Sequence, residues 1–331
     1  MRKNKILSVI CGFSMFFSLQ TAMGQDMQLS QYDASPILLN PALTGMKQNL
    51  KYRIVQQYRN QWDAVTQKSF LSSALAYDMN LKQKWGAGAY LQNDNSSRIF
   101  NSFSFVLSGA HDIIIGSQDK YHLAVGLQAG FIYKTLRLSQ YTFDKQYNQG
   151  GFDTDLSNGE SFERSKRFMP EVNFGFAYMN TNTAIKYHPY GGFAIMHCTY
   201  PKNNFLAEEV VSRLPLRYVI NGGSLVKIND KITLDPKLLI MKQNTVWQFN
   251  PGILVHCTLE AGDLNVIGGV FYRVNDAVIT QVGLYYKNFI YRISYDFNVS
   301  KLKTYSQYKG GIEFSIIFFR TSGSGSKLQI N

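Results

Sequence analysis

The sequence has little cysteine, proline or charge. Its 331 residues include 3 cysteines and 8 prolines, and 17% of them are charged. This composition excludes a disulfide-stapled small domain and a proline-rich disordered chain. Lys and Arg outnumber Asp and Glu by 34 to 22, but they are scattered, whereas a nucleic-acid surface would need them clustered. Beyond Leu19 there is no apolar run long enough to predict a transmembrane helix.

The first 24 residues have the pattern of a secretory signal peptide. Three basic residues precede an apolar stretch from Ile6 to Leu19, and Ala22-Met23-Gly24 resembles a cleavage site of small residues. We therefore expect the chain to be exported, with Gln25 as the first residue after cleavage.

Aromatic residues are abundant and occur in alternating patterns. There are 23 Phe and 21 Tyr residues. In residues 172–179, large apolar side chains alternate with small or polar ones, which is the period of a β-strand. About fourteen such runs occur, most of them about 10 residues long, the length of a tilted strand that crosses a membrane. They lie near 49–59, 68–78, 85–93, 99–111, 120–134, 170–180, 185–198, 215–228, 231–241, 244–257, 263–272, 277–287, 288–298 and 309–319.

The connections between these runs favour an all-β fold, a transmembrane antiparallel β-barrel of about 14 strands in the outer membrane. Such barrels have short periplasmic turns and longer extracellular loops, and their apolar side chains face lipid. Here short turns at 229–230 and 287–288 alternate with long polar stretches at 135–169, 199–214 and 299–308. The alternative is a soluble all-β protein, which would need a second sheet or helices to cover its large apolar face.

These patterns divide the chain into four parts. Residues 1–24 form the predicted signal peptide, and residues 25–48 form an irregular segment at the periplasmic mouth or in the lumen. The barrel is predicted to extend over 49–319, followed by a flexible tail at 320–331.

Several charged residues fall on the polar side of the alternation, where a barrel has its lumen. We predict that they form a buried charge network that holds the barrel and any plug; the alternative is that they line a channel. They are Arg53, Arg59, Arg292, Asp296 and Glu313.

The sequence contains no motif for nucleotide binding, zinc-dependent hydrolysis or serine hydrolysis. We therefore expect a protein that is not an enzyme and that needs no cofactor or metal. Histidines such as His122 and His197 leave an outer-membrane lipid-modifying enzyme as a further alternative. Cys198 and Cys257 are far apart and are expected to pack as small apolar side chains.

Short motifs follow one another through the chain in a defined order. They are Gln25-Asp26-Met27-Gln28-Leu29-Ser30-Gln31-Tyr32, Asn40-Pro41-Ala42 with Gly45, Tyr58-Arg59-Asn60-Gln61-Trp62, Asn93-Asp94, Gly126-Leu127 with Gly130, Tyr295-Asp296 and Gly311-Ile312-Glu313. This ordered set resembles the PorP/SprF family of Bacteroidetes outer-membrane proteins over essentially the whole chain after residue 24. Met27, where that family usually has proline, and residues 63–65 depart from the pattern.

The resemblance implies a barrel of about fourteen strands with a non-enzymatic part in the type IX secretion system, which exports adhesins, enzymes and gliding-motility proteins. Members of the family associate with periplasmic ring proteins and a peptidoglycan-binding lipoprotein, or they serve one exported adhesin by recognising its C-terminal domain. From the residues alone, a small-solute channel or porin remains the alternative.

Two regions are predicted to bind partners. The N-terminal segment and the short turns would form a periplasmic contact surface, and the long loops would face exported cargo, since aromatic side chains among charged ones suit protein binding. A lid over the lumen or a plug is the alternative for each. The residues concerned are Gln31, Tyr32, Asn40 and Pro41 in the first region and Tyr141, Phe143, Tyr147, Phe152 and Phe162 in the second.

Overall fold

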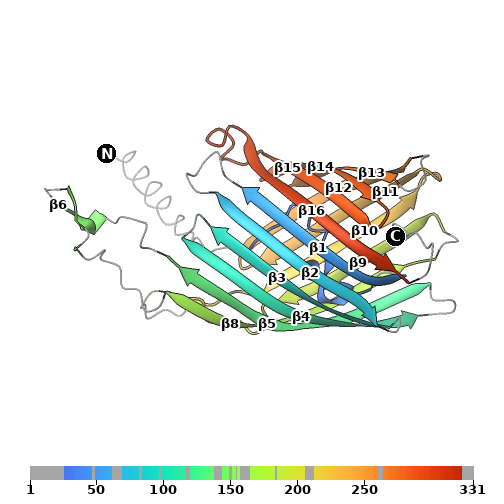
Figure 1. Cartoon of the computed structure of the whole chain (residues 1–331), viewed down its shortest axis with the longest axis horizontal. Coiled ribbons are helices and arrows are strands. Elements are labelled where there is room, and N and C mark those ends of the chain that lie inside the picture. The colour runs from blue at the N-terminus through green and yellow to red at the C-terminus, as the bar shows by residue number, and fades with distance from the viewer. Residues whose placement is uncertain are drawn as a thin grey trace, which may run out of the picture.

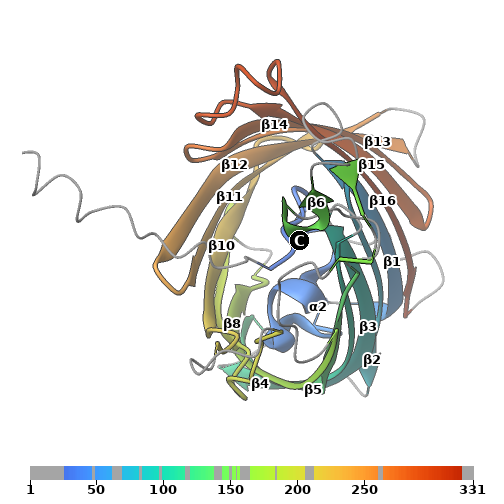
Figure 2. The ribbon, with the colours of Figure 1, turned by 90° about the vertical axis from the view of Figure 1, so that its left-hand side faces the viewer.

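The computed structural model shows a single closed barrel with a chain segment inside it (Figures 1 and 2). Among the residues that the structure describes, no helix has the length and hydropathy needed to cross a membrane. The described residues are 26–46, 49–61, 69–81, 84–96, 99–115, 120–137, 144–148, 151–153, 155–156, 165–182, 185–205, 212–259 and 264–322.

Each long strand of the barrel is antiparallel to its two neighbours, and β1 pairs with β16 to close the sheet. The strands are β1 (Leu50–Gln61), β2 (Phe70–Leu81), β3 (Trp85–Ser96), β4 (Phe100–Ile115), β5 (Tyr121–Leu136), β8 (Lys166–Asn180), β9 (Tyr187–Met196), β10 (Arg217–Lys227), β11 (Ile232–Gln243), β12 (Val246–Thr258), β13 (Leu264–Arg273), β14 (Ala277–Tyr286), β15 (Phe289–Asn298) and β16 (Lys309–Thr321). The predicted barrel of about 14 strands is thereby confirmed.

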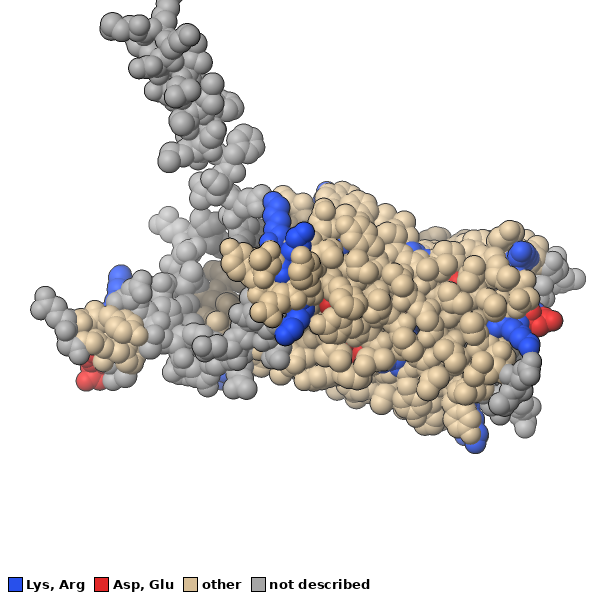
Figure 3. Space-filling model, turned by 90° about the horizontal axis from the view of Figure 1, so that it is seen from above, with Lys and Arg blue, Asp and Glu red and all other residues tan. Residues whose placement is uncertain are grey.

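Alternation along each strand separates an outer apolar face from the lumen. On β16, Phe314 and Ile316 are exposed on the outside, whereas Glu313 and Ser315 are buried on the inside. This is the reverse of a soluble sandwich, and it places uncharged side chains where lipid would contact the barrel. On the face shown in Figure 3, most exposed Lys and Arg lie toward the ends of the barrel, and the surface between them is largely uncharged.

The two ends of the barrel differ in the length of their connections. At one end, which we call the short-turn end, the longest connection is 181–186, and β1 begins and β16 ends there. At the opposite end, the long-loop end, the connections include 137–165, 197–216 and 299–308. The first of these contains a two-stranded hairpin, β6 (Tyr147–Asn148) and β7 (Gly151–Phe152), which the sequence patterns did not predict.

Residues 26–46, which we call the lumenal segment, lie inside the barrel (Figure 2). Two prolines start its only regular turns, α2 (Pro36–Leu39) and the 3-10 turn η1 (Pro41–Leu43). Proline lacks a backbone donor and is tolerated at the first position of a helix. The Asn40 side chain caps η1 by accepting a hydrogen bond from the Ala42 N–H at 2.9 Å. The segment thus satisfies part of its own backbone hydrogen bonding without pairing with a strand of the barrel.

The lumenal segment approaches the barrel wall closely where the wall has glycine. A Cβ atom on Gly126 of β5 would overlap the backbone of Pro41 and Ala42. One on Gly86 of β3 would overlap the Thr44 carbonyl. Two of the motifs singled out in the sequence, Asn40-Pro41-Ala42 and Gly126-Leu127, therefore meet in the structure because only glycine leaves room for the segment.

Candidate functional site

The lumenal segment runs from one end of the barrel to the other. Asp26 contacts His197, which follows β9, and Gln243, the last residue of β11, both at the long-loop end. Farther along, the Gly45 N–H donates to Asp78 of β2 at 2.8 Å, toward the short-turn end. Between these two contacts the described residues of the segment lie in the lumen.

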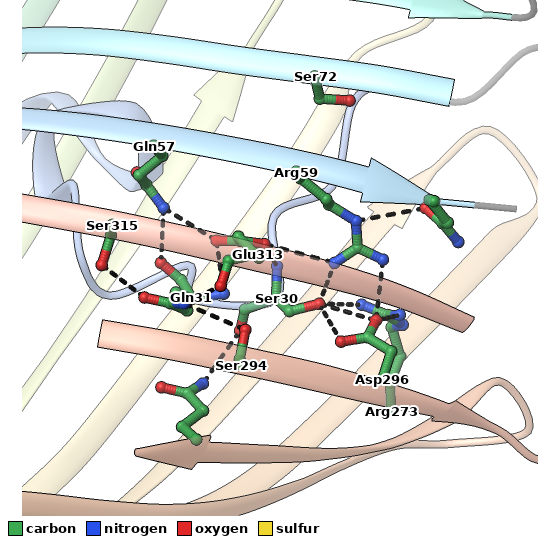
Figure 4. Close-up of polar contacts among 12 residues, drawn as sticks. Ser30, Gln31, Gln57, Arg59, Ser72, Arg273, Ser294, Asp296, Glu313 and Ser315 are labelled. Carbon is green, nitrogen blue, oxygen red and sulfur yellow. Dashed lines mark hydrogen bonds and ion pairs between the residues drawn. The ribbon is translucent and has the colours of Figure 1, made fainter. Parts of the chain in front are cut away.

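A buried ionic cluster, which we call the lumenal network, holds the first part of the segment (Figure 4). It consists of Ser30, Arg59, Arg273, Asp296 and Glu313. Arg59 lies 2.8 Å from Asp296 and 3.4 Å from Glu313, and Arg273 lies 2.6 Å from Asp296. The Ser30 hydroxyl donates to Asp296 at 2.7 Å and accepts from Arg59.

The backbone of the segment takes part in the same network. The N–H groups of Ser30 and Gln31 donate to the Glu313 carboxylate at 2.6 and 3.1 Å. The Gln31 side chain donates to Ser294 at 3.1 Å and accepts from Ser315 at 2.5 Å. The segment is therefore bound to β15 and β16 through its main chain as well as its side chains.

The lumenal network is almost completely buried, and Arg273 also pairs with Asp276, a partly exposed carboxylate 2.5 Å away. Two guanidinium groups face two carboxylates, and the four side chains are each 1–3% exposed. Because a buried ion pair is costly to desolvate, it adds little stability compared with a well-packed apolar pair in the same place. Removal of one partner alone is different, since it leaves a buried charge without compensation. The cluster therefore acts as a structural clamp. It fixes the segment to strands on both sides of the point where β1 pairs with β16.

The other two predicted lumen charges belong to separate ion pairs. Arg53 lies 2.7 Å from Asp78, and Arg292 lies 3.1 Å from Asp33 of the lumenal segment. Asp33 also contacts Lys237 of β11 at 2.9 Å. Both cations therefore share the Asp33 carboxylate. The five predicted residues are all buried, but only three share one cluster.

At the long-loop end, the segment is attached through a histidine. His197 Nε2 lies 2.6 Å from Asp26, and its Nδ1 lies 2.8 Å from Glu171 of β8. Burial lowers the pKa of His197, but the two carboxylates outweigh it and raise this pKa to about 9. Burial likewise opposes ionisation of Asp26, but His197 and Arg217 hold its pKa well below the usual range.

The structure corrects the predicted partner-binding role of the N-terminal segment. Gln31, Asn40 and Pro41 are buried in the lumen, and Tyr32 is partly buried beside them. Their polar groups bond to the barrel, as in the 3.0 Å hydrogen bond that Asn40 donates to the Phe176 carbonyl. Because these residues contact the inside of the barrel, they do not form an exposed periplasmic surface.

Of the predicted loop aromatics, two are described and both are exposed. Tyr147 and Phe152 belong to the β6–β7 hairpin, are 55% and 44% exposed, and pair with ring centroids 5.4 Å apart. Tyr141, Phe143 and Phe162 lie outside the described residues. Figure 1 shows the hairpin beyond the long-loop end of the barrel.

The remaining histidine and cysteine predictions have mixed outcomes. His122 pairs with Asp112 across β4 and β5 at 2.7 Å, so both histidines considered for catalysis are bound to carboxylates. Cys257 is half-buried, but Cys198 is exposed in a turn, contrary to the prediction that both are packed. In the described part of the chain, no group of three His, Cys, Asp or Glu is placed to hold a metal ion.

Sequence patterns missed several members of these clusters. Arg273 lies on the lumen face of β13. The sequence indicated its place in the buried cluster only by a charged residue at the end of an alternating run. Ser30 and Asp33 belong to a segment without periodicity, so no pattern predicted which strand each would contact. Glu171 and His197 are 26 residues apart, and only the pairing of β8 with β9 brings them together.

Fold and site together define a membrane β-barrel of the outer-membrane type whose lumen contains its own N-terminal segment. The family model described as "Type IX secretion system membrane protein PorP/SprF" matches residues 21–318. The chain belongs to this family, as the ordered motifs predicted.

The fold is similar to that of solved structures with low sequence identity. A TodX deltaS2S3 mutant monoaromatic hydrocarbon channel has a TM-score of 0.50 and 9% identity, covering 86% of this chain and 94% of that one. A Pseudomonas aeruginosa FadL homologue has a TM-score of 0.45 and 11% identity, covering 84% and 92%. These similarities concern the fold alone. The comparison with curated proteins gives no match.

The lumenal network predicts a large cost for removing one charge. Arg59→Met should lower the free energy of unfolding by about 3–5 kcal/mol, because Glu313 loses its ion pair while remaining buried. Urea unfolding in lipid vesicles, followed by the gel mobility of the folded barrel, measures this. Arg320→Met, at an exposed position of β16, is the matched control and should change stability by less than about 0.5 kcal/mol. Equal effects of the two substitutions would contradict the clamp.

The histidine attachment predicts a pH dependence at the long-loop end. Because the pKa of His197 is raised from 6.5 to about 9, its contribution is complete below pH 6.5 and is lost as the pH rises through about 9. The lowered pKa of Asp26 makes its contribution complete above pH 3.8 and lost at lower pH. Hydrogen exchange of the Asp26 end, corrected for intrinsic rates, should increase above pH 9. In His197→Gln it should be raised already at neutral pH, and an unchanged profile would exclude the attachment.

Proposed function

We propose that this chain is a non-enzymatic outer-membrane component of the type IX secretion system that anchors or couples other parts of the machinery and does not itself conduct cargo. The observation that carries the proposal is the lumenal segment, which is bonded to strands all around the barrel. Ser30, Asn40 and Thr44 contact β15, β8 and β4, respectively. A segment fixed to opposite walls suits a stable scaffold better than an open conduit.

The proposed orientation follows from the two ends of the barrel. Short turns face the periplasm and long loops face outward in barrels of this type. The short-turn end would then contact the periplasmic ring proteins and the peptidoglycan-binding lipoprotein that the family resemblance implies. Because the lumenal segment is buried, the turns and the rim of the barrel must supply that contact surface.

The long-loop end is proposed to hold an exported adhesin through its C-terminal domain. The β6–β7 hairpin presents Tyr147 and Phe152 to solvent, and Tyr200 is exposed in the loop after β9, with Arg213 stacked 5.4 Å from its ring. Aromatic residues and arginine are enriched in protein interfaces. The exposed side chains of this end therefore suit protein binding.

A small-solute channel is the second candidate, and a cavity in the short-turn half of the lumen favours it. Planar-bilayer recordings separate the two functions. We expect the wild-type protein to show no steady conductance, because the lumenal segment is bonded to opposite walls of the lumen. Removal of residues 26–46 should produce steps of open-barrel size, provided that the variant keeps the gel mobility of a folded barrel. Steady ion conductance by the wild type would reject the scaffold in favour of the channel.

Secretion itself tests the proposed role. We expect deletion of the gene to trap proteins with type IX C-terminal signals in the periplasm if the chain is a core component, or to remove one large adhesin from the surface if it is a dedicated partner. Quantitative mass spectrometry of both fractions distinguishes these outcomes. Unchanged secretion would reject the proposed function.

Complementation of the deletion strain then tests the long-loop end. A Tyr147→Ala, Phe152→Ala double variant should retain barrel assembly but hold less cargo at the surface. Tyr305→Ala, which removes another exposed aromatic ring at the same end, is the matched control and should behave as wild type. Full cargo retention by the double variant would exclude the hairpin as the contact site.

A further inference from the structure

The short-turn half of the lumen contains a cavity of about 660 Å³. Its lining reaches Asn49, Thr181 and Ser322 at the short-turn end, so it is accessible from that side. In the other direction, residues of the lumenal segment such as Tyr32 and Leu39 line it. The Arg59–Asp296 cluster lies beyond them and does not line it. The cavity is thus a recess under the segment, and we call it the short-turn cavity.

One wall of the short-turn cavity is apolar, which is unusual for the lumen of a barrel. The strands β12 to β16 turn large apolar side chains inward there, and the sequence pattern assigned polar residues to this face. They are Leu254, Ile267, Tyr285, Ile290, Ile317 and Phe319. The inward direction is clear on β16, where Ile317 is 7% exposed and its neighbour Ile316, on the lipid side, is 46% exposed.

Another part of the lining is polar, and we call it the polar wall; it includes His256 of β12 and Arg292 of β15, beside the apolar side chains of those strands. Lys237 lies 2.9 Å from Asp33 and 2.8 Å from Asp235, and Arg292 lies 3.1 Å from Asp33. The two positive and two negative groups satisfy one another. A bound molecule with a full charge of its own would have to compete with these pairs, so the wall suits an uncharged polar group.

The same wall has buried hydrogen-bonding atoms without a partner. Both ring nitrogens of His256, the Tyr32 hydroxyl, the Asn221 side-chain oxygen and His188 Nδ1 have no hydrogen-bond partner among the described residues. All four residues line the cavity. Buried polar groups are ordinarily paired. An uncharged ligand with hydroxyl or amide groups would supply both the donors and the acceptors that these atoms lack.

From these observations we infer that the short-turn cavity binds a single-chain amphiphile with an uncharged, hydroxyl- or amide-bearing head. The chain would lie along the apolar wall, and the head would bond to His256, Asn221 and Tyr32. The volume of the cavity falls within the range of small-molecule sites, about 300–1,000 Å³. Water could bond to the polar wall but would not match the apolar side chains beside it. This inference does not rest on a role in secretion.

The cavity would hold its ligand and not pass it on. The lumenal segment lies across the inner end, with Ala34, Pro36 and Leu43 among the lining residues. Entry and exit are therefore limited to the short-turn end. The source of the amphiphile would be the periplasmic leaflet or the periplasm, if the barrel has the orientation proposed above.

Photo-crosslinking tests the inference with the full-length protein in lipid nanodiscs. The probe is a monoacylglycerol with a diazirine in the middle of its chain, and the crosslinked residues are mapped by peptide mass spectrometry. We expect labels on inward-facing residues such as Ile267 and Ile317 in addition to labels on the lipid-facing side. Excess unlabelled monoacylglycerol should suppress the inward labels, because a site is saturable and the surrounding lipid is not.

Matched variants assign the labels to the cavity. Ile317→Trp should place an indole ring in the cavity and reduce the inward labelling several-fold, whereas Ile316→Trp on the outer face should not. Ile267→Trp, on another strand, tests the same point if Ile317→Trp fails to give the gel mobility of a folded barrel. Asn221→Leu should weaken the competition by unlabelled monoacylglycerol up to about tenfold, the effect of one lost hydrogen bond.

Three results would overturn the inference. The first is labelling confined to lipid-facing residues. The second is inward labelling that excess monoacylglycerol does not suppress, and the third is equal inward labelling in Ile316→Trp and Ile317→Trp. Stronger competition by a fatty acid than by the monoacylglycerol would overturn the assignment of an uncharged head.

Discussion

The structure depends on charges that are buried where the barrel closes. Arg59 comes from β1, Glu313 from β16, Asp296 from β15 and Arg273 from β13, so the network joins strands from both sides of the closure. Removing any one of these side chains would leave a partner buried without its counter-charge. Ser30 completes the set with its hydroxyl and its N–H. Barrel closure and the position of the lumenal segment are therefore two aspects of one electrostatic arrangement.

This arrangement explains why the motifs that identify the family are so far apart in the sequence. Ser30-Gln31, Arg59, Asp296 and Glu313 come from four of them, and they meet in the lumenal network. A second set, Asn40-Pro41-Ala42 and Gly126, meets where the segment lies against β5. The motifs thus describe how a chain segment is fitted into a barrel.

The lumen is divided into two halves of different chemistry. The long-loop half contains the lumenal network and the first residues of the segment, whereas the short-turn half has a cavity with one apolar wall. Part of that wall packs against the segment itself, since Ile37 belongs to the same apolar cluster as Leu254 and Phe319. The segment therefore provides packing contacts in the lumen and also borders the short-turn cavity.

The sequence by itself determined the barrel, because side-chain alternation and connection length are local properties. Residues 172–179 and 309–319 show the period of a strand without reference to any neighbour, and every predicted run overlaps an observed strand. The same alternation placed Arg59, Asp296 and Glu313 on the inner face. Only the tertiary structure decided their partners, because Ser30 and Asp33 lie in a segment without periodicity and contact strands more than 200 residues away. It also decided that Gln31 and Asn40 are buried, since a segment's polarity is the same whether its hydrogen bonds go to a partner protein or to the inside of its own barrel.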